Sequence, residues 1–215
     1  MSKAHSIVAH QFDDIEQQAE ADSLGMWVFL ATEVLFFGGM FAAFMVYRSS
    51  YPAVFAQASK EMAVAIGGIN TGVLLLSSLT VVLSVYAVKE NDRRGLIRNL
   101  LFTILLGVTF LVLKGVEYTE HIQHHLLPGF DFQYHGLDPD RAQIYFFMYY
   151  VMTGIHALHM LIGVGVMSVM LYGAYRNKYD SVNYMSIEVS GLYWHFVDIV
   201  WIFLYPMIYL IDVHK

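Results

Sequence analysis

The sequence predicts an all-α membrane protein, a bundle of five transmembrane helices, and three observations support that fold class. Of the 215 residues, 57% are hydrophobic and only 14% are charged, whereas charged residues make up about a quarter of an ordinary soluble domain. Five apolar stretches are each long enough to cross the roughly 30 Å hydrocarbon core of a bilayer as a helix. They are also too long and too uniformly apolar to be the ~10-residue alternating strands of a membrane β-barrel.

Each predicted span is a nearly uninterrupted apolar run. The spans cover residues 24–47, 62–88, 96–118, 142–174 and 189–212. The fourth is the longest, so it must tilt in the membrane or project beyond it. The residues before the first span are polar and acidic and carry no secretory cleavage signal. We therefore expect a polar N-terminal tail over 1–23, with Asp13, Asp14 and Glu16 solvated, and one transmembrane domain over 24–215.

The basic residues predict the orientation, because cytoplasmic loops carry an excess of Lys and Arg. Seven lie on the side of the N-terminal tail and of the second and fourth connections: Lys3, Lys89, Arg93, Arg94, Arg98, Arg176 and Lys178. Four lie on the opposite side: Arg48, Lys60, Arg141 and Lys215. This excess favours a cytoplasmic N-terminus, and an odd number of spans then makes the C-terminus external. The longest connection, 119–141, falls on the external side.

Composition excludes several kinds of chemistry. The chain has no cysteine, so disulfides, thiolate metal sites, iron–sulfur clusters and thiol catalysis are ruled out. The formal net charge is −6, and only one short basic cluster is present, in KENDRR. Both observations argue against a nucleic-acid partner.

Ionisable side chains inside the predicted spans are the candidates for function, since each costs about 2.5–3.5 kcal/mol near the bilayer centre. They are Glu33, Lys114, Glu117, His156, His159, Glu188, His195 and Asp198. Glu33 lies about a third of the way along the first span. A lone membrane carboxylate of this kind is either an element of a proton relay or a neutral group that is hydrogen-bonded to a neighbouring helix, and the sequence leaves both open.

Two histidines of the fourth span have a spacing that suits a shared ligand. His156 and His159 are three residues apart, which places both on one side of the helix. A single haem iron needs axial ligands on opposite sides of the macrocycle, and a mononuclear metal site needs further ligands. Gly154 and Gly163 would let a neighbouring helix approach closely, so interhelical hydrogen bonding explains the pair at least as well.

The segment EYTEHIQHH is the most metal-like part of the chain. Glu117 with His121, and Glu120 with His124, repeat at a spacing of four residues, which can present ligands on one helical face. A carboxylate-bridged di-iron bundle requires Glu-x-x-His motifs on two helices and glutamates on two more, and no other span pairs Glu with His in this way. We therefore expect surface histidines at a helix end near lipid headgroups, and no metal site.

The stretch YWHFVDIVWIFLY places a histidine and an aspartate inside the last span. His195 and Asp198 are three residues apart, so the carboxylate could accept a hydrogen bond from the imidazole and fix its tautomer. Spacing does not decide whether such a pair does chemistry. An aromatic and aliphatic stripe at helical spacing predicts packing against other helices: Trp194, Val197, Trp201, Leu204 and Tyr205.

Five segments, in this order, resemble subunit III of the haem–copper oxidases of the cytochrome c oxidase type. They are SLGMWVFLATEVLFFGGMFAAF, INTGVLLLSSLTVVLS, LLGVTFLVLKGVEYTEH, TGIHALHMLIG and, most specifically, LYWHFVDIVWIFLYPMIYL. Together they extend over roughly residues 24–212. Longer members of the family have seven spans, with two helices ahead of the one that carries the glutamate, and this chain resembles the short five-span bacterial form.

The resemblance implies an accessory, non-catalytic subunit of a proton-pumping oxidase that passes electrons from cytochrome c to O2 in aerobic respiration. It implies that this chain holds no cofactor and that haem and copper are bound by subunits I and II, beside a possible small subunit IV. The implied role is to support subunit I and proton uptake and to bind phospholipid, and the implied location is a bacterial plasma membrane. By position, Glu33 matches the family's membrane-embedded acid, and Arg176 and Lys178 match basic residues near lipid headgroups. The remaining candidates match recurring polar positions with an interhelical role: Glu117, His156, His159, Glu188, His195 and Asp198.

Other functions stay open at this point. Subunit III of a quinol oxidase, or a homologue associated with nitric oxide reductase, shares the same scaffold. A different class is a stand-alone membrane haem or metal enzyme with histidine ligands. A proton-coupled carrier is disfavoured because its inverted repeats and broken helices are not seen in these continuous spans.

Overall fold

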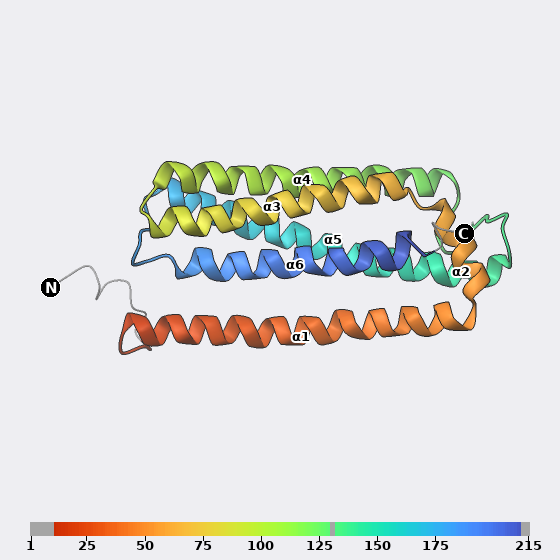
Figure 1. The fold of residues 1–215 in the computed structure, drawn as a ribbon, viewed down its shortest axis with the longest axis horizontal. Helices are drawn as coiled ribbons and strands as arrows, with labels where there is room; N and C mark the ends of the chain where they lie inside the picture. Colours follow the sequence, from red (N-terminus) through yellow and green to blue (C-terminus); the bar gives the residue numbers. More distant parts are fainter. Residues whose placement is uncertain (1–10, 130–131, 212–215) are drawn as a thin grey trace.

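The computed structural model describes residues 11–129 and 132–211, and these residues form helices without any strand. In chain order the elements are α1 (Ile15–Ser50), α2 (Pro52–Ala58), the short 3-10 helix η2 (Ser59–Glu61), α3 (Val64–Lys89), α4 (Arg93–Gln123), α5 (Pro139–Tyr175) and α6 (Met185–Tyr209). Figure 1 shows the five long helices lying side by side, with α1 along one edge of the bundle.

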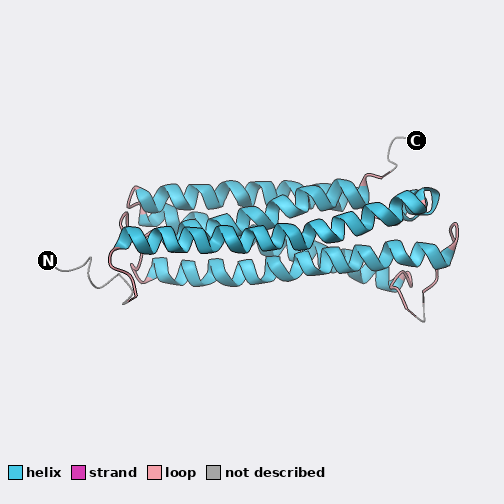
Figure 2. Cartoon of the chain, turned by 90° about the horizontal axis from the view of Figure 1, so that it is seen from below, coloured by secondary structure: helices cyan, strands magenta, loops and turns pink. Residues whose placement is uncertain are grey.

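Five helices are long and apolar enough to cross a membrane, which confirms the predicted all-helical membrane fold. The shortest, α6, has 25 residues and so measures about 38 Å, longer than the bilayer core. Successive long helices run in opposite directions, so that the connections gather at the two ends of the bundle (Figure 2). Residues Ile15 and Tyr209 therefore lie at opposite ends, as an odd number of spans requires.

Helix α1 begins nine residues before the predicted first span, inside the stretch that the sequence assigned to a polar tail. Asp14 is its N-cap, and the Asp14 side chain accepts a 2.7 Å hydrogen bond from the backbone N–H of Gln17. In return, the Gln17 side chain accepts from the backbone N–H of Asp13 at 2.8 Å, which completes a reciprocal capping arrangement. Asp14 is thus a helix cap and not merely a solvated charge, and α1 projects beyond its apolar segment.

The connection predicted over 119–141 is shorter than expected, because both flanking helices extend into it. Helix α4 continues to Gln123, and α5 begins at Pro139. Asp138 caps α5 by accepting from the backbone N–H of Arg141, and its backbone lies in the left-handed region at φ 46°. Pro139 suits the first helical position because its missing N–H is not needed there.

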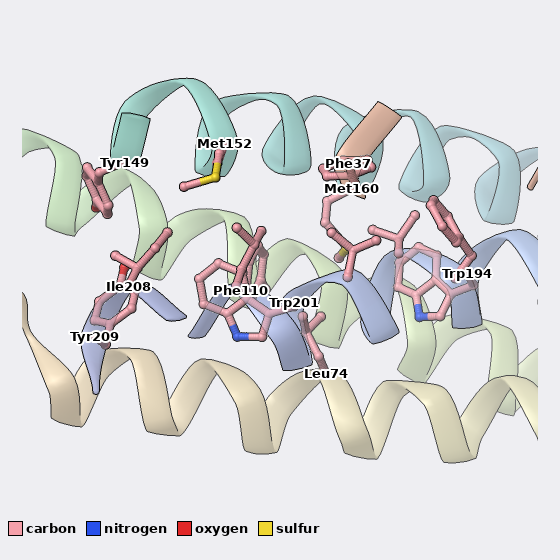
Figure 3. Packing of buried hydrophobic residues seen from close by; sticks show 14 of the residues in the cluster. Phe37, Leu74, Phe110, Tyr149, Met152, Met160, Trp194, Trp201, Ile208 and Tyr209 are labelled. Carbon is pink, nitrogen blue, oxygen red and sulfur yellow. The ribbon is translucent and has the colours of Figure 1, made fainter. Parts of the chain in front are cut away.

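The core of the bundle is built around α6, which lies against α3, α5 and α1. Figure 3 shows Trp201 beside Phe110 of α4 and Leu74 of α3, and the rings of Trp201 and Phe110 meet edge to face at 4.8 Å between centroids. The predicted packing stripe is confirmed, since four of its members are buried: Trp194, Val197, Trp201 and Leu204. Tyr205 is partly buried and packs against the same core.

Trp194 fits between two glycines of neighbouring helices. A Cβ atom added to Gly107 of α4 would stand 2.7 Å from the indole, and one added to Gly163 of α5 would stand 3.1 Å from it. The indole N–H donates a 3.0 Å hydrogen bond to the hydroxyl of Ser77 in α3. One side chain therefore joins α6 to three other helices, and only glycine leaves room for it at the closest contact.

Candidate functional site

The most extensive polar cluster inside the described part of the bundle joins α4, α5 and α6. The Lys114 ammonium lies 2.8 Å from Oε2 of Glu117, 2.6 Å from the Tyr209 hydroxyl and 3.3 Å from the Tyr149 hydroxyl. Oε1 of Glu117 accepts from the hydroxyl of Tyr149 at 2.9 Å and from that of Tyr209 at 2.6 Å. Lys114 is 2% exposed and Glu117 is completely buried.

This cluster satisfies the groups that it buries. The three N–H donors of the ammonium have three oxygen partners, and both carboxylate oxygens of Glu117 accept hydrogen bonds. The Lys114 ammonium also lies 5.2 Å from the centre of the Trp201 ring, which adds a cation–π contact. Charges in a membrane are tolerated when they are paired in this way, so the cluster acts as a polar clasp between helices.

The two tyrosines of this clasp were not predicted from the sequence, although Lys114 and Glu117 were recognised as costly in a membrane. Tyr149 and Tyr209 are 32 and 92 residues away from Glu117 along the chain. Both tyrosines lie in aromatic stretches of the sequence, where a tyrosine is ordinarily interpreted as a core or membrane-interface residue. The signal that could have identified them is a tyrosine at the same depth in the membrane as a charged residue of another span, because its hydroxyl can then bond to that charge.

His121 is buried, and the prediction of a surface histidine at this position is wrong. Its side chain is 4% exposed, and its ring lies 5.4 Å from that of Tyr149. The backbone of Glu61 in η2 also lies close to the His121 ring. His124, three residues later, is exposed as expected.

Glu33 faces α5 rather than a solvated space. Its Oε2 atom lies 3.6 Å from Nε2 of His159, and both side chains are largely buried. The Tyr193 hydroxyl of α6 donates to the carbonyl oxygen of His159 at 3.0 Å and lies 3.3 Å from its Nδ1. The candidate acid therefore stands at the meeting point of α1, α5 and α6.

His156 and His159 face different neighbours in spite of their three-residue spacing. The His156 ring is fully buried between Phe110, at 5.4 Å, and Trp201, at 5.2 Å, whereas His159 points toward Glu33. Neither ring nitrogen of His156 has a hydrogen-bond partner among the residues that the structure describes. The two imidazoles consequently do not form one ligand pair.

His195 and Asp198 do not pair with each other. Nδ1 of His195 lies 2.6 Å from the hydroxyl of Ser78, which connects α6 to α3. Ser78 also stands close to Asp198, but within the described residues neither carboxylate oxygen has a hydrogen bond of ordinary geometry. The expected hydrogen bond between His195 and Asp198 within α6 is therefore absent from the described residues, and His195 instead bonds to Ser78 of α3.

The remaining candidates lie at the end of the bundle where α1 begins. Glu188 forms a 3.1 Å ion pair with Lys89, which links the start of α6 to the end of α3. Arg176 and Lys178 are exposed at the end of α5. Lys3 and Lys215, which the orientation argument used, lie outside the described residues.

Arg93 makes a contact between two helices that the sequence did not reveal. Its Nε donates to the carbonyl oxygen of Ala174 at 3.2 Å, and its Nη2 donates to that of Tyr175 at 2.7 Å. These carbonyls belong to the last turn of α5, and that of Ala174 also accepts from the backbone N–H of Asn177 at 3.2 Å. The first residue of α4 therefore caps the end of α5.

Across residues 11–129 and 132–211, no three histidine, aspartate or glutamate side chains come together as a ready set of metal ligands. Comparison with known proteins then decides the family. A family model described as cytochrome c oxidase subunit III matches residues 13–213. The chain belongs to the cytochrome c oxidase subunit III family.

Curated relatives of this subunit III chain come from cyanobacteria and from animals. The cytochrome c oxidase subunit 3 of Synechocystis sp. is 31% identical over 188 residues, which cover 87% of this chain and 74% of that protein. The subunit 3 of Thermostichus vulcanus is 30% identical over 200 residues, with 93% and 92% covered. The subunit 3 of Loxodonta africana is 34% identical over 195 residues, with 86% and 67% covered.

Membership of the subunit III family makes this chain a multi-pass membrane protein and a component of a haem–copper oxidase complex. The geometry adds what its polar residues do inside the chain. Lys114 and Glu117 join α4 to α5 and α6, Glu33 brings α1 to α5, and His195 joins α6 to α3. In this subunit III, most of the candidate polar groups are thus engaged in contacts between helices.

Proposed function

We propose that this chain is the accessory, non-catalytic subunit III of a proton-pumping oxidase that passes electrons from cytochrome c to O2. The observation that carries the proposal is the family match over residues 13–213. The geometry supports it, since the Lys114–Glu117 clasp and the Glu33–His159 contact hold helices together. Subunit III stabilises subunit I in this proposal, and haem and copper belong to subunits I and II.

The outer surface of the bundle supports association with such partners and with phospholipid. Long helices expose aliphatic and aromatic side chains along much of their length, including Leu35 and Phe36 of α1. A groove of about 440 Å³ between α1 and α6 is lined almost entirely by apolar side chains, and Phe37 and Phe203 are among them. In the proposed complex, subunits I and II, a possible small subunit IV and lipid acyl chains cover these surfaces.

Proton uptake is the finer role that we assign to the buried acid. Glu33 is a carboxylate within an apolar helix, and its Oε2 atom lies 3.6 Å from the imidazole of His159. A carboxylate and an imidazole in contact can exchange a proton without a large movement. Glu33 therefore supports the proton supply of the complex, while the electron-transfer chemistry takes place in other subunits.

The membrane orientation and location belong to the same proposal. Arg93, Arg176 and Lys178 gather at the end of the bundle where α1 begins, and we place this end on the cytoplasmic side of a bacterial plasma membrane. Arg176 and Lys178 are exposed there, within reach of anionic lipid headgroups. A respiratory assembly larger than one oxidase would use the outward faces of the same bundle.

Purification of the tagged chain from its native membrane in a mild detergent tests the proposal. We expect haem-containing partners in fixed ratio, a haem–copper oxidase spectrum and oxidation of reduced cytochrome c. A co-purifying subunit II without copper ligands and oxidation of quinol would instead identify a quinol oxidase, and nitric oxide reduction would identify the other homologue. Stoichiometric haem or iron in the isolated polypeptide would overturn the proposal in favour of a stand-alone metal enzyme.

A further inference from the structure

The Tyr193 hydroxyl of α6 makes two contacts with one residue of α5. It donates to the backbone carbonyl oxygen of His159 at 3.0 Å, and its oxygen lies 3.3 Å from Nδ1 of the His159 ring. On the other side of the imidazole, Nε2 faces Oε2 of Glu33 in α1 at 3.6 Å. The imidazole is therefore held between a phenol and a carboxyl group that come from two other helices.

The packing around these groups limits rotation of both rings. The ring of His159 meets that of Phe37 edge to face at 5.4 Å between centroids, and it is stacked on the ring of Tyr193 at 6.3 Å. The ring of Phe29 contacts the phenol from α1, with 6.1 Å between centroids. A Cβ added to Gly163, one turn further along α5, would stand 3.4 Å from Cε1 of Tyr193, so this glycine lets the phenol lie close to α5. Tyr193 is only 7% exposed in this position.

The hydrogens available on these groups decide which nitrogen of His159 carries one. A phenol has a single O–H, and that of Tyr193 is donated to the carbonyl oxygen of His159. The phenol oxygen must then accept from Nδ1, so Nδ1 carries a hydrogen. A neutral imidazole has a hydrogen on one nitrogen only, which leaves the lone pair of Nε2 directed toward Glu33.

This tautomer determines where the proton of the Glu33–His159 pair lies. In an ionised Glu33, Oε2 would be a charged atom in an apolar span facing a lone pair, and within the described residues it accepts no hydrogen bond. The pair therefore shares one proton, which lies on Oε2 of Glu33 or on Nε2 of His159. Transfer between them breaks an O–H bond and forms an N–H bond, and the pair has no net charge before or after it.

We propose that Tyr193 is a positioning residue of the Glu33–His159 pair, whose hydroxyl holds His159 in the Nδ1–H tautomer and keeps Nε2 available to accept the proton of Glu33. Without this hydroxyl, the hydrogen can occupy either nitrogen, and an Nε2–H tautomer donates to a carboxylate instead of accepting from an acid. The use of the pair in proton uptake rests on the proposed function, whereas the tautomer does not.

Nitrogen NMR of the purified complex in lipid tests the positioning directly. The complex is labelled with nitrogen-15 histidine, and the His159 signals are identified by their loss in His159→Gln. We expect a hydrogen on Nδ1 in the wild type. In Tyr193→Phe, which keeps the ring and removes the hydroxyl, the ratio of Nδ1–H to Nε2–H should fall about twofold to tenfold, the effect of one lost hydrogen bond.

Tyr205→Phe is the matched control, because it is the same change on the same helix. It removes a hydroxyl that donates to the carbonyl oxygen of Val64 at 3.2 Å, so it also loses one contact between helices. The His159 signals should stay unchanged in this variant. Glu33→Gln should likewise keep the hydrogen on Nδ1, since the Tyr193 hydroxyl is present and the glutamine amide can donate to Nε2.

Three results would overturn the proposal: a hydrogen on Nε2 alone in the wild type, wild-type His159 signals in Tyr193→Phe, or an equal shift in Tyr205→Phe. The role of the pair in proton uptake is tested separately by the turnover of Glu33→Ala. A shifted tautomer in Tyr193→Phe together with full and lasting turnover in Glu33→Ala would support the positioning by Tyr193 and refute the role in uptake.

Discussion

The contact between Trp194 and Gly107 gives the sharpest test of how the bundle is packed. In Gly107→Ala, the new Cβ would stand 2.7 Å from Cη2 of Trp194 and 3.1 Å from Cγ2 of Val164. The indole cannot move away freely, because Gly163 supports its other side and Ser77 holds its N–H. Overpacking of this kind costs about 1–3 kcal/mol.

Gly115→Ala is the matched control on the same helix, because nothing lies within 4 Å of a Cβ added there. Both variants gain up to about 1 kcal/mol from the higher helix propensity of alanine, so the difference between them isolates the packing cost. We expect Gly107→Ala to be less stable than Gly115→Ala by about 1–3 kcal/mol. Unfolding by sodium dodecyl sulfate in mixed micelles, followed by tryptophan fluorescence and circular dichroism, measures both.

A double variant checks the assignment to the indole. When Trp194→Phe removes the outer ring, the additional loss caused by Gly107→Ala should shrink, which appears as a coupling energy in a double-mutant cycle. Equal stability of Gly107→Ala and Gly115→Ala, or strict additivity in the cycle, would refute the packing argument.

Three further changes address the polar contacts. Lys114→Met leaves the charge of the buried Glu117 unpaired and should destabilise the bundle by about 3–5 kcal/mol in the same micelle assay. Adding Glu117→Gln removes that charge and should restore part of the lost stability. If the double variant showed no recovery, the buried ion pair would be contradicted. Arg93→Ala should lower stability by about 1 kcal/mol through the lost cap of α5, whereas the adjacent exposed Arg94→Ala should stay within about 0.5 kcal/mol. Glu33→Ala should retain assembly and haem content in the purified complex and mildly reduce turnover or its duration, and loss of the whole complex would show that Glu33 is mainly a packing residue.

The five spans could be predicted because length and hydropathy alone define a membrane helix. The ends of the helices could not, since they depend on caps. Asp14 and Asp138 each cap the first turn of a helix outside the apolar runs, where hydropathy carries no signal. The prediction therefore placed the start of α1 too late and made the connection before α5 too long.

The partners of the candidate residues were beyond the sequence for a different reason. Which side chains meet depends on how far one helix is shifted and rotated against the next. For example, Lys114 donates a hydrogen bond to Tyr209, which is 95 residues away in the sequence. Periodicity predicted that His195 and Asp198 share a face, but Ser78 of another helix takes the hydrogen bond. His121 was placed on the surface because the sequence does not reveal that Tyr149 of α5 packs against it.

The position of α1 at one edge of the bundle has a consequence for biogenesis. Phe37 packs on Phe196 and Phe29 packs on Tyr193, so α1 meets partners that are synthesised about 160 residues later. At the usual rate of translation this corresponds to roughly 8–30 s. During that interval the first helix lacks its contacts with α6, although Phe44 can already pack on Phe55 of α2 and Glu33 can later meet His159 of α5. A ribosome that stalls before Met185 would leave a first helix without its α6 partners, which membrane quality control could then remove.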